Sequence, residues 1–230
     1  MKITLISDTH TKHWQLKLPG GDVLIHAGDF MNSGYTYYEI EDFLNWLAIQ
    51  KYTTKIFIAG NHDRIFEDDP GHISEIMQKY PNITYLQDNS IQVGEDWDNP
   101  FTIWGSPWQP EFYNWAFNLP RNGEKLEQKW SKIPENTDIL VTHGPPQEIL
   151  DMSGPPYNQP LLGCELLKSR VDIIKPKIHV FGHIHGSYGY KYFNGTHFFN
   201  AAVLGENYQI QTERPHTIKW DVETNEIKFI

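Results

Sequence analysis

Short apolar runs that end in polar turns recur along this chain. Five of them lead into side chains that can bind a metal ion: ITLISDTH (3–10), VLIHAGDF (23–30), KIFIAGNHD (55–63), DILVTHG (138–144) and KIHVFGHIH (177–185). An apolar run followed by small and polar residues is typical of a buried strand that ends in a tight turn. The pattern therefore predicts five strands that each present polar side chains just beyond their ends.

Helices and further strands fill the rest of the chain. Helices are expected at 35–51, where Ile40, Phe43, Leu44 and Leu47 form an apolar stripe, and at 73–79, 123–130 and 164–171. Strands are expected at 83–86, 91–93, 101–104, 198–203 and 217–230, the last with a hairpin turn at Thr224 and Asn225. This alternation predicts a mixed α/β sandwich, in which ligands gather beyond the carboxyl ends of the strands. Without repeats or a visible boundary, residues 1–230 are expected to form a single domain.

Charge narrows the possible partners. A formal net charge of −10 argues against a protein that coats a nucleic-acid backbone, so no stable nucleic-acid complex is expected. A phosphate-containing substrate remains compatible with that charge, because bound divalent cations would locally reverse its sign. The sequence leaves the oligomeric state open.

The location of the protein is suggested by what the sequence lacks. A single cysteine, Cys164, excludes an intrachain disulfide. The chain reaches a possible metal ligand at Asp8, which leaves no room for a cleavable signal peptide, and no run approaches about 18 apolar residues. We therefore expect a soluble, cytoplasmic protein that does not enter a membrane.

The strand-end turns hold a mixed set of nitrogen and oxygen ligands. It comprises five of the eleven histidines, two aspartates and an asparagine: His10, His62, His143, His183, His185, Asp8, Asp29 and Asn61. Such a set suits Mn, Fe, Zn or Ni. Each short motif alone is weak evidence, but five in succession at strand ends indicate a metal site. Asp29, central to the others, is expected to bridge two ions.

The order DxH, GD, GNH(D/E), H-G and GHxH resembles that of the calcineurin-like metallophosphoesterases and extends from Asp8 to His185. The phrases HAGDF, GSPWQPEFYNWAFN, THGPP and VFGHIHGSYGY resemble the branch of the vertebrate MPPED-type phosphodiesterases and their bacterial relatives. The resemblance implies a four-layer α/β/β/α sandwich of two mixed sheets flanked by helices. It also implies two divalent ions, with Mn preferred over Fe, Zn, Ni, Co or Mg.

The resemblance also assigns roles to individual residues. Asp8, His10 and His185 would hold one ion, Asn61, His143 and His183 the other, and Asp29 both. A hydroxide shared by the ions would attack phosphorus. His62 would protonate the leaving oxygen, a task suited to an imidazole.

Residues around this set are candidates for supporting roles. Trp108, Phe112 and Trp115 could stack a nucleobase, or they could fill a satellite core under a long loop. Arg64 and Arg121 are possible phosphate contacts, with a surface position as the alternative. His26 could orient a ligand, and Asp63 could support the site or cap a turn.

The predicted function is a dinuclear metal-dependent phosphodiesterase that hydrolyses a small phosphodiester such as a cyclic nucleotide. A phosphomonoesterase or protein phosphatase is the main alternative. GDFMNSG and AGNHD, however, lack the arginines and second aspartate of the protein phosphatase motifs GDxVDRG and RGNHE. A binding scaffold with this fold is disfavoured because every ligand position is filled. A nuclease is disfavoured by the acidic charge.

Overall fold

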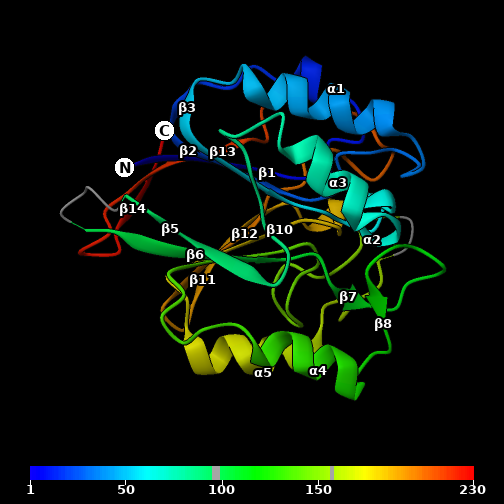
Figure 1. The fold of residues 1–230 in the computed structure, drawn as a ribbon. Coiled ribbons are helices and arrows are strands. Elements are labelled where there is room, and N and C mark those ends of the chain that lie inside the picture. Colours follow the sequence, from blue (N-terminus) through cyan, green and yellow to red (C-terminus); the bar gives the residue numbers. More distant parts are fainter. Residues whose placement is uncertain (95–98, 156–157) are drawn as a thin grey trace.

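The computed structural model describes residues 1–94, 99–155 and 158–230, and its two six-stranded sheets lie face to face (Figure 1). Trp97, Pro156 and Tyr157 lie outside the described residues. The first sheet has the order β14-β13-β1-β2-β3-β4. Its strands are β1 (Lys2–Ile6), β2 (Gly21–Ala27), β3 (Tyr52–Ile58), β4 (Thr84–Tyr85), β13 (His216–Trp220) and β14 (Ile227–Phe229). Strands β1 to β4 are parallel, whereas β13 and β14 are antiparallel to their neighbours.

The second sheet has the order β11-β12-β10-β9-β6-β5. Its strands are β5 (Asn89–Val93), β6 (Phe101–Ser106), β9 (Ile139–Thr142), β10 (Ile178–Phe181), β11 (Gly189–Phe193) and β12 (Thr196–Asn200). Four central strands are parallel, and the outer strands β5 and β11 are antiparallel. The expected two mixed sheets are therefore confirmed.

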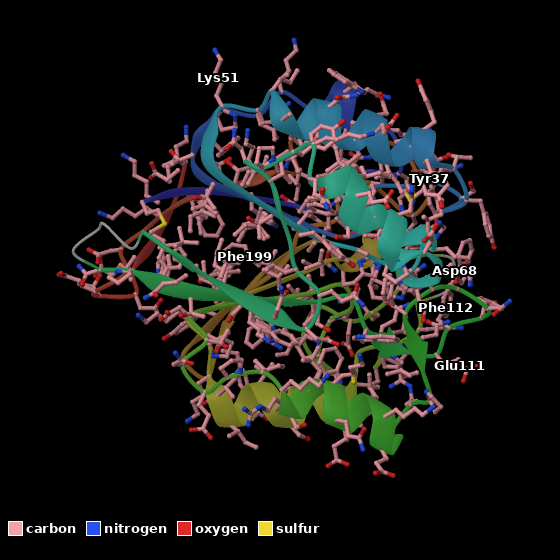
Figure 2. All side chains as sticks on the ribbon, in the orientation of Figure 1. Tyr37, Lys51, Asp68, Glu111, Phe112 and Phe199 are labelled. Carbon is pink, nitrogen blue, oxygen red and sulfur yellow. The ribbon has the colours of Figure 1, made fainter. Side chains whose placement is uncertain are left out.

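Three hydrophobic layers hold the sandwich together. Side chains such as Ile25 and Val141 meet between the sheets, and Phe199 lies among them (Figure 2). Helices α1 (Tyr37–Ala48), α2 (Ile65–Asp68) and α3 (Pro70–Met77) cover the first sheet, whereas α4 (Glu124–Ser131) and α5 (Glu165–Ile174) cover the second. Phe43 and Trp130 are fully buried under these helices. The four-layer α/β/β/α arrangement predicted from the sequence is confirmed.

The two sheets are linked where their parallel strands end. Ser7, just after β1, forms a parallel bridge with Ala202, just after β12. The Ser7 amide donates to the Ala201 carbonyl at 2.9 Å, and the Val203 amide donates to the Ser7 carbonyl at 3.0 Å. This link brings together the carboxyl ends of strands from both sheets, and all five ligand-bearing turns follow such ends.

Several elements differ from those expected. The helix expected at 35–51 covers Tyr37–Ala48, and the strand expected at 198–203 covers Thr196–Asn200. The sequence pattern did not predict β11, which pairs with β12 about a turn at Asn194 and Gly195. Both of these turn residues have positive φ, as a tight hairpin turn requires. It also missed α2, two 3-10 turns at His13–Gln15 and His185–Ser187, and the two-residue strands β7 (Gln109–Pro110) and β8 (Asn118–Leu119).

Candidate metal centre

The ligand-bearing turns adopt a backbone conformation that is unusual for their residues. Asp8, His10, Asp29 and His183 have φ angles of 53°, 38°, 58° and 66°. Residues other than glycine rarely enter this left-handed region, and such strain gathers at functional sites. The turns leave little space as well, because a Cβ on Gly182 would lie 2.0 Å from Asp8 Oδ2. The strand ends are thus built to direct particular side chains to one place.

The turns bring the predicted ligands into two clusters that meet at Asp29. One group is Asp8, His10 and His185, and the other is Asp29, His143 and His183; within each, the candidate ligand atoms lie within 4.8 Å of one another. Asp29 Oδ2 lies 3.7 Å from His10 Nε2 and 3.3 Å from His143 Nε2. Asn61 joins the second group, with Oδ1 2.9 Å from His143 Nε2. The Asp29 carboxylate therefore faces both clusters.

Three histidines share one orientation. The Nδ1 atoms of His10, His143 and His185 lie 3.0, 2.9 and 3.2 Å from the carbonyls of Met31, Ala27 and Gly205, in that order. A carbonyl only accepts, so each Nδ1 carries a proton and Nε2 is the nitrogen that each ring directs at the cluster. Metal-binding histidines are commonly oriented by a carbonyl on the second nitrogen in this way.

The electrostatics of the cluster favour a bound positive charge. Burial raises the pKa of Asp8, but the hydrogen bond and charge of His185 outweigh it and the pKa falls to about 2. Burial likewise raises the pKa of Asp29, yet the charges of His143 and His62 hold it well below its usual range. For His143 burial lowers the pKa, and Asp29 overcomes this and raises it to about 9. Both carboxylates are therefore negative, and His143 binds a proton where a cation would also fit.

The residues present fit divalent metal ions. His10 Nε2 is buried and has no hydrogen-bond partner among the described residues, although it points into the cluster. Burial lowers the pKa of His10 to about 4 and that of His183 to about 3, so both rings are neutral and free to donate a lone pair. Imidazole nitrogens with carboxylate and amide oxygens are ligands typical of transition metals.

Asp63 and His26 support the turns rather than contact the ligand side chains. The fully buried Asp63 carboxylate accepts from the amides of Asp29, Gly60 and Met31 at 2.8, 2.7 and 2.9 Å. His26 Nδ1 accepts from the Gly28 amide at 3.2 Å, and its Nε2 lies 3.0 Å from Thr9 Oγ1. Both side chains hold the backbone next to Asp29.

His62 lies beside the ligand cluster and is positioned by contacts with Asn32, Trp115 and His10. Its Nδ1 donates to the Asn32 carbonyl at 2.7 Å, and its ring stacks on Trp115 with centroids 4.0 Å apart. Its ring is nearly perpendicular to that of His10, with ring centroids 4.6 Å apart. One ligand atom of His62 lies within 4.8 Å of those of His10 and Asp29. With Nδ1 engaged, Nε2 is the nitrogen that can face a substrate.

The other predicted substrate contacts fall into two groups. Phe112 is half exposed and its ring lies 5.7 Å from His183, so Phe112 and Trp115 both border the cluster; Phe112 is labelled in Figure 2. Trp108 instead donates from Nε1 to Asp88 at 3.0 Å and lies 4.0 Å from Lys129 Nζ. Trp108 thus packs between elements of the fold.

Neither predicted arginine has its guanidinium in the cluster. Arg64 donates to the carbonyl of Asn114 and lies near Asp68. Arg121 donates to the carbonyls of Leu162 and Gly163 and pairs with Glu165 at 2.7 Å. Both side chains tie loops together.

Tyr208 borders the cluster and was not singled out by the sequence. Its ring centroid lies 5.0 Å from that of His10 and 5.1 Å from that of His185. Burial and the charges of Asp29 and Asp8 raise its pKa to about 12, so the phenol keeps its proton. No periodic pattern or motif marks residues 204–211, and only the fold brings them here.

Comparisons with known proteins agree with this geometry. The sequence model for calcineurin-like phosphoesterases matches residues 1–187. Human metallophosphoesterase domain-containing protein 1 is 40% identical over 229 residues, which cover 90% of this chain and 68% of that protein. The UPF0046 protein T07D4.2 of Caenorhabditis elegans is 35% identical over 260 residues, covering 97% of this chain and 63% of its own length.

A solved structure shares the fold, and the sequence relatives establish the family. Phosphopantetheinyl hydrolase of Mycobacterium tuberculosis superimposes with a TM-score of 0.60 at 17% identity, covering 90% of each chain. Within the described residues, the helices are too short or too polar to cross a bilayer. The family match over residues 1–187 and the 40% identity to the human protein show that this chain belongs to the calcineurin-like phosphoesterases, in the branch of metallophosphoesterase domain-containing protein 1.

Proposed function

We propose that this protein is a dinuclear metal-dependent phosphodiesterase that hydrolyses a small phosphodiester such as a cyclic nucleotide. The observation that carries the proposal is the position of Asp29, whose carboxylate faces His10 on one side and His143 on the other. A carboxylate between two groups of nitrogen and oxygen ligands is what two neighbouring metal ions require.

The chain offers three further ligands to each ion. Asp8, His10 and His185 would hold one, and Asn61, His143 and His183 the other, with Asp29 shared. Manganese is the proposed metal because the resemblance to the family implies it, and a set that mixes imidazole nitrogen with carboxylate and amide oxygen is compatible with it. When bound, the two ions would neutralise charge on the phosphoryl group and supply the attacking hydroxide.

His62 is the proposed general acid. Its Nδ1 proton is committed to the Asn32 carbonyl, so the proton passed to the leaving oxygen must come from Nε2. Trp115, stacked on the ring, and His10, nearly perpendicular to it, keep that nitrogen directed at the cluster. A positioned acid of this kind contributes about 10²–10⁴-fold to a rate.

The preference for a diester follows from the positive charge available. A phosphomonoester carries up to two negative charges, and a diester carries one. The two arginines that the sequence suggested as phosphate contacts, Arg64 and Arg121, donate to carbonyls of neighbouring loops instead. Less charge neutralisation by side chains favours the singly charged diester.

A direct test is a metal-reconstitution assay. Protein stripped with EDTA is reloaded with Mn, Ni, Co, Zn or Mg and given bis(p-nitrophenyl) phosphate and p-nitrophenyl phosphate, then 2′,3′- and 3′,5′-cyclic nucleotides. We expect metal-restored diester cleavage, lost in Asp29→Ala and His62→Ala and kept in His72→Ala, which alters an exposed histidine of α3. Faster monoester cleavage would favour a phosphomonoesterase. No turnover despite two bound ions would indicate a binding scaffold.

A further inference from the structure

The segment from Val203 to Gln211 forms a closed loop beyond the residues that match the family model. Its amides and carbonyls pair internally: Gly205 with Gln209 at 3.0 Å, Tyr208 with Gly205 at 2.8 Å, and Gln211 with Val203 at 2.8 Å. A loop that satisfies its own backbone in this way has a defined shape. It can therefore present a side chain at a fixed place.

Three contacts hold this loop in place beside the ligand cluster. The Gly205 carbonyl lies 3.2 Å from His185 Nδ1, so the loop helps to orient that ring. Arg214 Nη1 donates to the Leu204 carbonyl at 2.8 Å, and Lys12 Nζ donates to the Tyr208 carbonyl. Lys12 lies two residues after His10. The loop is therefore connected both to His185 and to the segment that carries His10.

Tyr208 has a strained backbone in this loop. Its φ is 57°, a conformation that glycine and asparagine adopt readily and a bulky aromatic residue rarely does. The ring lies against both His10 and His185, yet 43% of the residue is exposed. An aromatic ring held in a costly conformation, half against the site and half open to solvent, indicates a functional position.

Three aromatic rings border the ligand cluster, and each of them contacts different histidines. Trp115 stacks on His62, Phe112 lies beside His183, and Tyr208 lies against His10 and His185. The phosphoryl group of a bound ester would lie at the metal ions. Its organic groups would therefore lie against the aromatic rings that border the cluster. We propose that Tyr208 is a specificity-determining residue whose ring binds a planar organic group of the ester on the His10 side, an inference that rests on the proposed function.

The contact is chemically suited to a flat, unsaturated group. An aromatic ring stacks on the face of a base or aryl group irrespective of its hydrogen-bonding pattern, and removal of one such contact weakens binding about tenfold. The ring is what matters in this scheme, so Tyr208→Phe should behave as the wild type. Asparagine tolerates positive φ, so Tyr208→Asn removes the ring and spares the turn.

The experiment compares two ligands on the manganese-loaded protein. Calorimetry gives the Kd of phenylphosphonate and methylphosphonate, and the metal content of every variant is measured alongside. We expect the wild type and Tyr208→Phe to prefer phenylphosphonate and Tyr208→Asn to lose about tenfold in that preference. Tyr113→Asn is the matched control, because Tyr113 is also an exposed tyrosine with positive φ, 50°, and its ring contact is with Phe112.

Each outcome has a separate meaning. A phenyl preference that survives in Tyr208→Asn, or is absent from the wild type, overturns the inference. Equal weakening of both ligands with less bound metal also overturns it, since Tyr208 would then only support His10 and His185. If the wild type binds two ions yet cleaves no phosphodiester, the proposed function fails instead, whatever the phosphonates show.

Discussion

The His62 imidazole lies on the Trp115 indole, with ring centroids 4.0 Å apart and planes inclined by 29°. The loop that carries Trp115 is tied to the segment that carries His62. The Ala116 amide donates to the Asn61 carbonyl at 3.1 Å, and the Phe117 amide donates to Glu67 at 2.6 Å. The proposed acid and its stacking partner therefore form one assembly.

Trp115→Ala should lower kcat for an aryl diester about 3- to 10-fold, because an aromatic pair contributes about 0.5–1.5 kcal/mol to holding a ring. The loss should be smaller than that of His62→Ala, since the Asn32 carbonyl still orients Nδ1. Steady-state kinetics on the manganese-loaded proteins measure both. Trp115→Phe keeps a stacking ring and should retain most of the rate.

A double mutant separates orientation of His62 from substrate binding by Trp115. If Trp115 acts through the imidazole, Trp115→Ala should have little further effect on kcat in a His62→Ala background. Full additivity of the two losses in kcat would contradict this coupling. A change confined to KM would assign Trp115 to binding alone.

Asp63→Asn should destabilise the protein by about 1–3 kcal/mol. The buried carboxylate accepts three amides, whereas the side chain of the asparagine variant has only one oxygen, so at least one donor is left facing an NH₂ group. Metal affinity should also fall, because those amides belong to the turns of Asp29 and Gly60. Urea unfolding and metal titration measure the two effects.

Asp221 provides the matched control for Asp63. It accepts from the amides of Glu223 and Thr224 in an exposed turn. Asp221→Asn should change stability by less than about 1 kcal/mol, since water can satisfy exposed donors. Similar losses in the two variants would show that burial of the Asp63 network is not what stabilises the turns.

Arg121→Ala should leave kcat/KM for a diester within about twofold of the wild type. Its guanidinium bonds to Leu162, Gly163 and Glu165 and takes no part in the cluster. Arg64→Ala should cost more, about 3- to 10-fold, because it releases the Asn114 carbonyl one residue before Trp115. A large loss of kcat/KM in Arg121→Ala with none in Arg64→Ala would contradict both expectations, because Arg121 and not Arg64 would then support the site.

The strands and ligand turns could be predicted because their signals are local. The apolar run before Asp29 and the small residues beside it mark a buried strand and the turn that ends it. The order of such runs predicts a mixed α/β sandwich, and the resemblance to the family implies its four layers. The edge strand β11 was missed because its pattern is mixed, with Tyr190 and Phe193 exposed.

The border of the site could not be read in the same way. The identity of Trp108 indicates that it can stack, and only the fold shows that its indole N–H donates to Asp88 and that Lys129 Nζ lies over its ring. Tyr208 lies 198 positions after His10, and their contact depends on the pairing of Ser7 with Ala202 at the junction of the two sheets. Long-range placement of this kind leaves no periodicity in the sequence.

Buried neutral histidines should make the fold sensitive to acid, and His179 shows how. It is fully buried, its Nε2 lies 2.9 Å from Thr142 Oγ1, and burial lowers its pKa to about 3. The unfolded chain binds this proton near pH 6.5, so between about pH 6.5 and 3 it holds more protons than the native state. Stability therefore falls as the pH decreases through that window.

His179→Leu should flatten that dependence. The Thr142 hydroxyl still donates to the Gly144 carbonyl at 2.7 Å, so the substitution leaves no donor unpaired. Between about pH 6.5 and 5 the variant should lose about 2 kcal/mol less than the wild type, as roughly 1.36 kcal/mol per pH unit gives for one site. Urea unfolding in EDTA at each pH measures this, with the exposed His72→Leu as control. Parallel curves for wild type and His179→Leu would mean that the native state protonates His179 as readily as the unfolded chain, which its burial beside Phe181 and Phe198 opposes.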